Sequence, residues 1–112
     1  FLRFRDRAVA AGITAPLVPG ILPVSNFAQT RSFASACGAQ VPDWLADLFA
    51  GLDQHPEPRQ LIASTVASDL ALRLYAEGVR DFHFYTLNRA GLTQAVCHLL
   101  GRRLPAAAEA AR

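Results

Sequence analysis

The sequence contains no lysine, no methionine and only two cysteines. All eleven cationic side chains are therefore arginines, and only Arg102 and Arg103 are adjacent, so no basic stripe predicts a nucleic-acid partner. Cys37 and Cys97 lie far apart and belong to no Cys-x-x-Cys or zinc-like cluster. We expect buried free thiols, with no disulfide framework and no metal site.

Long apolar runs are also missing. No segment approaches the roughly 18 consecutive apolar residues that a membrane-spanning helix needs. Residues 1–7 mix charged and apolar side chains and lack the hydrophobic region of a signal peptide, so we expect a cytoplasmic protein without a membrane anchor. Because the sequence does not begin with methionine, we expect Phe1 to be an internal residue of a longer polypeptide.

Two short, apolar segments predict strands that each lead into a helix. Residues 17–24 are almost wholly apolar without alternation, which predicts a strand buried on both faces and kept short by its two prolines. The N-cap residues Ser25 and Asn26 follow, with a helix expected to residue 37. Residues 82–87 predict the second strand, followed by a helix at about 91–100. Ligands of parallel α/β folds gather at the carboxyl ends of strands, so the residues just after each strand are the candidate site.

The other patterns predict helices. Residues 1–11 are amphipathic, and a short helix begins near Pro42. Residues 54–58 form a proline-rich turn. A long helix is expected at 59–77, with an apolar stripe at four-residue steps formed by Ile62, Val66, Leu70 and Leu74. Residues 102–112 form an alanine-rich tail that a proline interrupts.

This order of elements favours an α/β fold. Strands separated by helices pair in parallel through right-handed crossovers. Two parallel strands buried on both faces cannot form a sheet alone, because their outer edges stay unpaired. We therefore predict a portion of a larger domain. A (β/α)8 TIM barrel suits it, because each strand leads directly into a helix cap.

Several stretches resemble bacterial methylenetetrahydrofolate reductases. The longest are Pro-Gly-Ile-Leu-Pro-Val-Ser-Asn-Phe at 19–27 and Asp-Phe-His-Phe-Tyr-Thr-Leu-Asn-Arg-Ala at 81–90, with shorter ones at 2–13, 41–44 and 51–53. The resemblance covers roughly residues 1–101. It implies the carboxy-terminal portion of a flavin-binding (β/α)8 TIM barrel: the last two βα units and the preceding helix, with the earlier strands absent.

The resemblance also implies an activity. Enzymes of this family use NAD(P)H to reduce bound FAD, which passes a hydride to 5,10-methylenetetrahydrofolate and yields 5-methyltetrahydrofolate. Their pocket must accept nicotinamide and folate in turn. The full-length enzyme is then expected to be a homo-oligomer of one-carbon metabolism, with most of the FAD contacts outside this chain.

By the same resemblance, four residues after the strands contact the folate substrate: Gln29, Phe33, Leu87 and Arg89. The Gln29 amide can read a pterin edge, although the residues alone favour a capping box with Asn26. Phe33 is expected to pack on the aromatic part of the folate, while its spacing alone favours a core residue. Arg89 suits a carboxylate or carbonyl of the folate, or alternatively an ion pair with a neighbouring helix. Leu87 is expected to line the same cleft.

No catalytic residue is expected in this chain. The family's acid catalyst, a glutamate, and its flavin-tuning aspartate belong to earlier strands, and no acidic residue of this sequence matches them. His83 and Tyr85 share one face of the second predicted strand. On the packed inner face of a barrel strand, a hydrogen-bonded core histidine is more common than a general base, so we interpret His83 as structural.

Two interpretations from other classes stay open. The five helical patterns also fit a small helical interaction module without catalysis, which the two strand segments argue against. The chain also fits an inactive, truncated barrel portion that is unstable, associates with copies of itself and binds flavin poorly.

Overall fold

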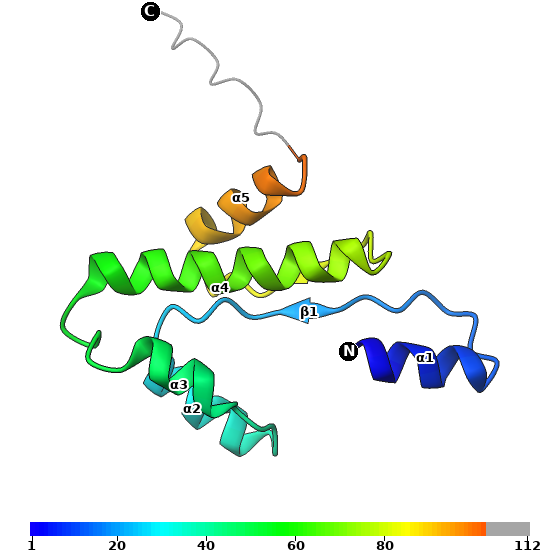
Figure 1. Ribbon diagram of the computed structural model, residues 1–112, viewed down its shortest axis with the longest axis horizontal. Coiled ribbons are helices and arrows are strands. Elements are labelled where there is room, and N and C mark those ends of the chain that lie inside the picture. Colours follow the sequence, from blue (N-terminus) through cyan, green and yellow to red (C-terminus); the bar gives the residue numbers. More distant parts are fainter. Residues whose placement is uncertain (103–112) are drawn as a thin grey trace, which may run out of the picture.

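The computed structural model describes residues 1–102, so the alanine-rich tail expected for 102–112 lies, apart from Arg102, outside the described residues. Along the chain the elements are α1 (Leu2–Ala10), β1 (Gly20–Ile21), α2 (Phe27–Ala36), α3 (Asp43–Phe49), α4 (Pro56–Ala76), β2 (His83–Phe84) and α5 (Ala90–Leu99) (Figure 1). The predicted order of helices and strands is confirmed.

The two strands pair in parallel, with Gly20 opposite His83. The backbone amides of His83 and Tyr85 donate to the carbonyl oxygens of Pro19 and Ile21, each at 3.0 Å. The predicted parallel pairing is therefore confirmed. Because α2, α3 and α4 all lie between the strands in sequence, the connection is a long crossover, as parallel strands require. The ladder also argues against the helical interaction module.

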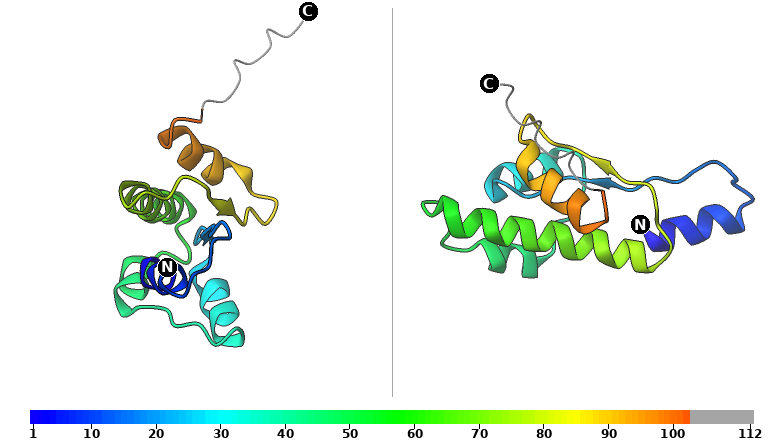
Figure 2. Two further views of the ribbon diagram at one scale, coloured as in Figure 1. Left: turned by 90° about the vertical axis from the view of Figure 1, so that its right-hand side faces the viewer. Right: turned by 90° about the horizontal axis from the view of Figure 1, so that it is seen from above.

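Both strands are shorter than the predicted segments 17–24 and 82–87. Pro19 and Pro23 have no amide hydrogen to donate, and within residues 1–102 each strand has a partner on one side only. The side chain of Val18 is 46% exposed, so the expectation of burial on both faces is wrong. The helices α4 and α5 lie on the same side of the strand pair (Figure 2).

The core lies between the strand pair and the helices α4 and α5. It is made of side chains that are almost fully buried: Ile21, Ala67, Ala71, Leu74, Val79 and Val96. The long helix α4 runs alongside β1 in the opposite direction (Figure 1). Its buried positions are mostly alanines, whereas Leu70 is 45% exposed. Small side chains let the helix backbone lie close to its neighbours. The buried stripe of α4 therefore shares only Leu74 with the predicted stripe of larger residues.

A second cluster lies at the carboxyl end of β1 and positions α2. Val24, Phe49 and Ala63 are buried there. The rings of Phe27 and Phe49 stack with centroids 5.7 Å apart and an interplanar angle of 8°. This contact holds the first residue of α2 against α3, and so determines where the helix starts after the strand.

The first residue of α4 and the hydrogen bonds at its carboxyl end can both be explained. The helix begins at Pro56, before the predicted start at residue 59, because proline fits the first helical turn, where its missing amide hydrogen is not needed. At the other end, Arg5 of α1 donates to the Glu77 carbonyl at 2.7 Å, and Arg80 donates to the Tyr75 carbonyl at 2.6 Å. The Arg5 bond satisfies a carbonyl group at the helix end and fastens α1 to α4. The Arg80 bond adds a second donor to the Tyr75 carbonyl, which the Gly78 amide also binds at 3.1 Å.

The two cysteines are free, as predicted. Cys97 is half-buried, but Cys37 is exposed, so the expected burial of Cys37 is wrong. Cys37 follows α2, a helix without any buried residue. Within residues 1–102, every helix is too short or too polar to serve as a membrane span.

A larger side chain at Ala71 tests whether α4 packs as closely against the core as described. This side chain is 0% exposed, so the substitution Ala71→Leu must displace its neighbours. We expect a loss of about 1–3 kcal/mol in the free energy of unfolding, measured by urea unfolding followed by circular dichroism. Ala76→Leu, at an exposed position of the same helix, is the matched control and should change that free energy by less than about 0.5 kcal/mol. Equal losses in the two variants would contradict the described packing.

Exposed apolar side chains predict that the 112-residue chain self-associates. Val18 is 46% exposed and Tyr85 is 51% exposed, close to the strand pair. Apolar surface next to unpaired strand edges favours contact between copies. Sedimentation velocity at rising concentration should show species larger than the monomer, because association depends on concentration. A single monomeric species at every concentration would contradict this expectation.

Candidate functional site

A pocket lies where the two strands end. Its cavity volume is about 380 Å³, and its walls come from the β1–α2 connection, the first turns of α2 and the segment after β2. The lining residues are Leu22, Pro23, Ser25, Asn26, Gln29, Thr30, Phe33, Tyr85 and Leu87. Parallel strands end at the same edge of a sheet, and α/β folds bind ligands at that edge.

Asn26 determines the geometry of the first turn of α2. Its Oδ1 accepts a hydrogen bond from the backbone amide of Gln29 at 3.0 Å, which is the usual N-cap interaction. Thr30 Oγ1 donates to the Asn26 carbonyl at 2.9 Å. These bonds hold Gln29 in the first helical turn, beside the pocket.

The side chain of Gln29 does not complete a capping box. Within residues 1–102 its carboxamide makes no hydrogen bond, so the return bond to the Asn26 amide is missing. The capping-box interpretation is therefore only half right, since Asn26 caps the helix but Gln29 does not. The carboxamide lines the pocket with its donor and its acceptor both unused by the described residues.

Phe33 and Leu87 complete the apolar part of the pocket. Phe33 lies one turn after Gln29 and is 61% exposed, so the core interpretation of this residue is wrong. Leu87 comes from the segment after β2 and is 65% exposed. Three of the four predicted substrate residues thus line one pocket, although they come from two segments far apart in the sequence.

A left-handed turn carries Leu87 to the pocket. The φ angles of Leu87 and Asn88 are 48° and 61°, a region that L-residues other than glycine adopt at a cost of roughly 1–2 kcal/mol each. The Arg89 amide donates to the Thr86 carbonyl at 2.8 Å and closes the turn. Strained backbone of this kind is retained where the surrounding structure enforces it, and it is common at ligand sites.

Arg89 is exposed and does not line the pocket. It is the N-cap residue of α5 and directly follows the left-handed turn, so its backbone stays close to Leu87. The ion pairs within residues 1–102 join Arg5 to Asp6 and Arg73 to Asp69. The alternative of an Arg89 ion pair with a neighbouring helix is therefore not found in this part of the chain.

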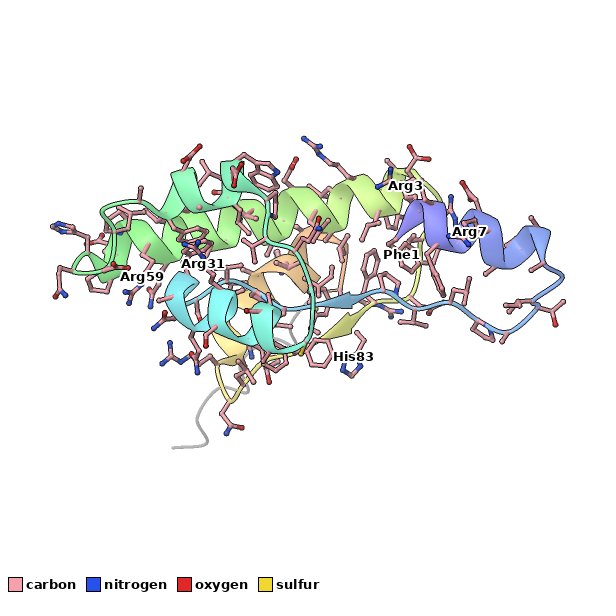
Figure 3. The ribbon with its side chains drawn as sticks, turned by 90° about the horizontal axis from the view of Figure 1, so that it is seen from below. Phe1, Arg3, Arg7, Arg31, Arg59 and His83 are labelled. Atoms are coloured by element: carbon pink, nitrogen blue, oxygen red, sulfur yellow. The ribbon has the colours of Figure 1, made fainter. Side chains whose placement is uncertain are left out.

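His83 and Tyr85 lie on the face of the strand pair that is opposite to the core. Their rings meet edge to face, with centroids 4.7 Å apart and an interplanar angle of 69°. His83 points away from α4 (Figure 3), as the inner face of a barrel strand requires. Within residues 1–102 it is exposed and its imidazole makes no hydrogen bond, so the expected hydrogen-bonded, buried histidine is not found in this part of the chain. Its face carries no covering element in residues 1–102. Tyr85 lines the pocket and was missed as a site residue, although strand alternation places it on the same face as His83.

A comparison with protein families matches residues 1–101 to the model of methylenetetrahydrofolate reductase. The chain belongs to this family. The resemblance of the blocks at 19–27 and 81–90 is confirmed. The family implies a TIM barrel, and two parallel strands with covering helices are consistent with part of one.

Named relatives support the same assignment. The chain is similar to the 5,10-methylenetetrahydrofolate reductase of Pectobacterium carotovorum, with 54% identity over 103 residues, and to that of Escherichia coli, with 52%. Each alignment covers 92% of this chain and 35% of the relative. The chain is also 30% identical over 88 residues to methylenetetrahydrofolate reductase (NADH) 1 of Arabidopsis thaliana, covering 79% of this chain and 15% of the relative. It thus spans about a third of the length of its bacterial relatives.

The family implies a flavin, and the pocket can be tested for its fit. The diphosphate of a flavin dinucleotide needs cationic side chains or unpaired helix amides. No arginine lines this pocket, and Asn26 already binds the Gln29 amide of α2. The pocket therefore does not fit the flavin diphosphate, whereas its aromatic rings and its carboxamide suit a planar ring with a polar edge. Within residues 1–102, no group of three His, Cys, Asp or Glu side chains could hold a metal ion.

Substitution of Asn88 tests the left-handed turn. We expect Asn88→Val to lower the free energy of unfolding by about 1–2 kcal/mol, because a β-branched side chain clashes with the backbone at this φ. Asn88→Gly should cost less than about 0.5 kcal/mol, because glycine adopts the left-handed region without strain. Urea unfolding of both variants measures the difference. If valine and glycine have the same effect, the turn does not require a left-handed residue.

Proposed function

We propose that this chain contributes the folate contacts of a flavin-dependent 5,10-methylenetetrahydrofolate reductase that uses NAD(P)H to make 5-methyltetrahydrofolate. One observation carries the proposal: Gln29, Phe33 and Leu87 line a single pocket at the strand ends of a chain that belongs to this family. In this proposal the chain supplies binding residues and no catalytic acid.

The carboxamide of Gln29 is suited to the pterin. A pterin edge presents donors and acceptors side by side, and a carboxamide offers one of each. Because the described residues leave this carboxamide unpaired, its pairing with a ligand breaks no hydrogen bond among them. Gln29 is exposed, so a ligand that covers the pocket would remove its carboxamide from water and would favour a complementary edge that pairs with it.

The apolar walls and Arg89 suit the rest of the folate. Phe33 and Leu87 expose apolar surface inside the pocket, where an aromatic ring can pack. Arg89 follows the turn that ends the pocket, beyond Leu87. The carboxylates of the folate's glutamate extend from the ring system, and a guanidinium fork binds a carboxylate in a bidentate manner. Arg89 is therefore proposed to bind the part of the substrate that leaves the pocket.

The flavin is proposed to be held by parts of the enzyme outside this chain, since the pocket does not fit its diphosphate. When bound, it supplies hydride transfer from the nicotinamide to the folate. The described residues orient the substrate ring and exclude water from its apolar side. The same pocket is proposed to bind the nicotinamide ring in turn. This ring has fewer polar groups that need a hydrogen-bond partner than the folate has.

Arg89→Ala tests this assignment in a chimera in which residues 1–101 replace the matching segment of the Escherichia coli relative. Loss of a charge-assisted contact, worth about 1.5–3 kcal/mol, is expected to lower kcat/KM for methylenetetrahydrofolate roughly tenfold to a hundredfold. Steady-state kinetics with both substrates measure the effect. The half-reaction with the nicotinamide should suffer less, because it lacks the glutamate carboxylates.

Arg31→Ala is the matched control, because Arg31 is an exposed arginine of α2 (Figure 3) that does not line the pocket. This variant should keep the kinetics of the unsubstituted chimera. Flavin content and melting temperature should stay unchanged in both variants. If Arg89→Ala loses its flavin or unfolds, Arg89 has a structural role and is not a substrate contact.

A further inference from the structure

The helix α2 supplies one wall of the pocket but is hardly buried itself. None of its residues is buried, and of its two large apolar side chains Phe33 is 61% exposed while Phe27 is half-buried. Within residues 1–102 the hydrogen bonds of α2 stay between Asn26 and Ala39, so none of them joins it to another element. An isolated helix of ten residues is marginal in water, so its position depends on the few contacts that it makes.

Open space separates most of α2 from α3, the helix beside it (Figure 1). A cavity of about 730 Å³ lies between the two helices, with Arg31 and Ser35 on one wall and Ala46 on the other. Phe27 and Phe49 line the same cavity, and their rings stack with centroids 5.7 Å apart. The ring pair therefore fastens the first turn of α2, while side chains of its later turns border open space.

Phe49 is held firmly on the other side of this contact. It is 3% exposed and belongs to one cluster with Val24 and Ala63. Val24 follows β1 and Ala63 belongs to α4, so Phe49 is anchored to the end of a strand and to the long helix. Neither Phe49 nor Phe27 lines the pocket. The stacked rings act on the pocket through the backbone of α2, which carries Gln29 two residues after Phe27.

From this arrangement we infer that Phe49 is a positioning residue of the pocket and acts through its stacked partner Phe27. With the stack in place, α2 presents Gln29 and Phe33 to the pocket. Without the stack, the helix has open space to move into, and a ligand binds only those molecules in which α2 is in place. The apparent affinity then falls in proportion to that fraction. The inference rests on the proposed function and extends it to a residue that touches no ligand.

Hydrogen exchange followed by mass spectrometry tests the attachment of α2 without any ligand, in the flavin-loaded chimera described above. Phe49→Leu keeps an apolar side chain but removes the ring, and should raise the exchange rate of the α2 amides roughly three- to tenfold. Val96→Ala is the matched control, because Val96 is 0% exposed in the core cluster of α4 and α5 and lies outside the cluster of Phe49. It should leave the α2 amides unchanged.

Titration calorimetry with 5-methyltetrahydrofolate as the probe measures the consequence for the pocket. Phe49→Leu should raise Kd about three- to tenfold, whereas Val96→Ala should leave Kd unchanged although it also removes buried side-chain volume. In steady-state turnover, Phe49→Leu should raise KM for methylenetetrahydrofolate and keep kcat, because saturating substrate holds α2 in place. A general loss of stability would act alike in the two variants.

A double-mutant cycle tests whether Phe49 acts through Phe27. Phe27→Leu removes the other ring of the stack and should raise Kd about as much as Phe49→Leu does. The double variant should bind about as tightly as either single variant, because both substitutions remove the same contact. Additive losses would show that Phe49 acts on the pocket by another route, and would overturn the inference.

The outcomes separate the inference from the proposed function. If Phe49→Leu leaves either the exchange of the α2 amides or Kd unchanged while Arg89→Ala weakens binding, the positioning role is wrong and the proposed function stands. An equal rise of Kd in Val96→Ala would likewise overturn the positioning role. If the unsubstituted chimera does not bind 5-methyltetrahydrofolate, the proposed function fails and the inference fails with it. If Phe49→Leu does not fold, Phe27→Leu decides alone at its half-buried position, and an unchanged Kd then overturns the inference.

Discussion

Two backbone hydrogen bonds determine what the rest of this chain can build. The amides of His83 and Tyr85 bind the carbonyl oxygens of Pro19 and Ile21, and so align the ends of two segments that are far apart in sequence. A capped helix starts after one end, and a left-handed turn follows the other. Gln29 therefore shares a pocket with side chains from the second segment, although nothing local connects them.

So short a ladder needs support from packing. A neutral hydrogen bond contributes about 0.5–1.5 kcal/mol net, and two strands without further cover are marginal in water. Ile21 is 2% exposed, and burial of such a side chain contributes about 1.5–3 kcal/mol, which exceeds either bond alone. The alanines of α4 matter for the same reason, because they let a long helix lie close enough to cover Ile21. The geometry of the pocket thus depends on a helix that contributes no residue to it.

The sequence predicted those features that depend on local chemistry. The apolar strand segments, the Asn26 cap and the blocks shared with the family lie within a few residues, and they led to the element order, the parallel pairing and the pocket residue Gln29. Which face of a strand is buried depends on the elements that pack against it in the folded chain. The exposure of Val18 was therefore not predicted. Two adjacent stripes of α4 have apolar side chains at helical spacing, one with Leu70 and one with Ala71. Periodicity does not decide which of them faces the core, and packing selects the stripe that contains Ala71. Tyr85 was missed as a pocket residue because strand alternation predicts which face of β2 a side chain lies on, but not which other elements cover that face.

The uncovered face of the strand pair is unusual for a surface in contact with water. The outer face of a half-exposed sheet normally carries polar side chains that alternate with buried ones. Here Gly20, His83 and Tyr85 occupy it, and an apolar pocket with Phe33 lies beside it. In a barrel this face, opposite the covering helices, is the inner one. The left-handed turn next to it stores backbone strain. The turn costs stability in a chain whose core is formed by the strand pair with α4 and α5, so it is best understood as a requirement of the pocket.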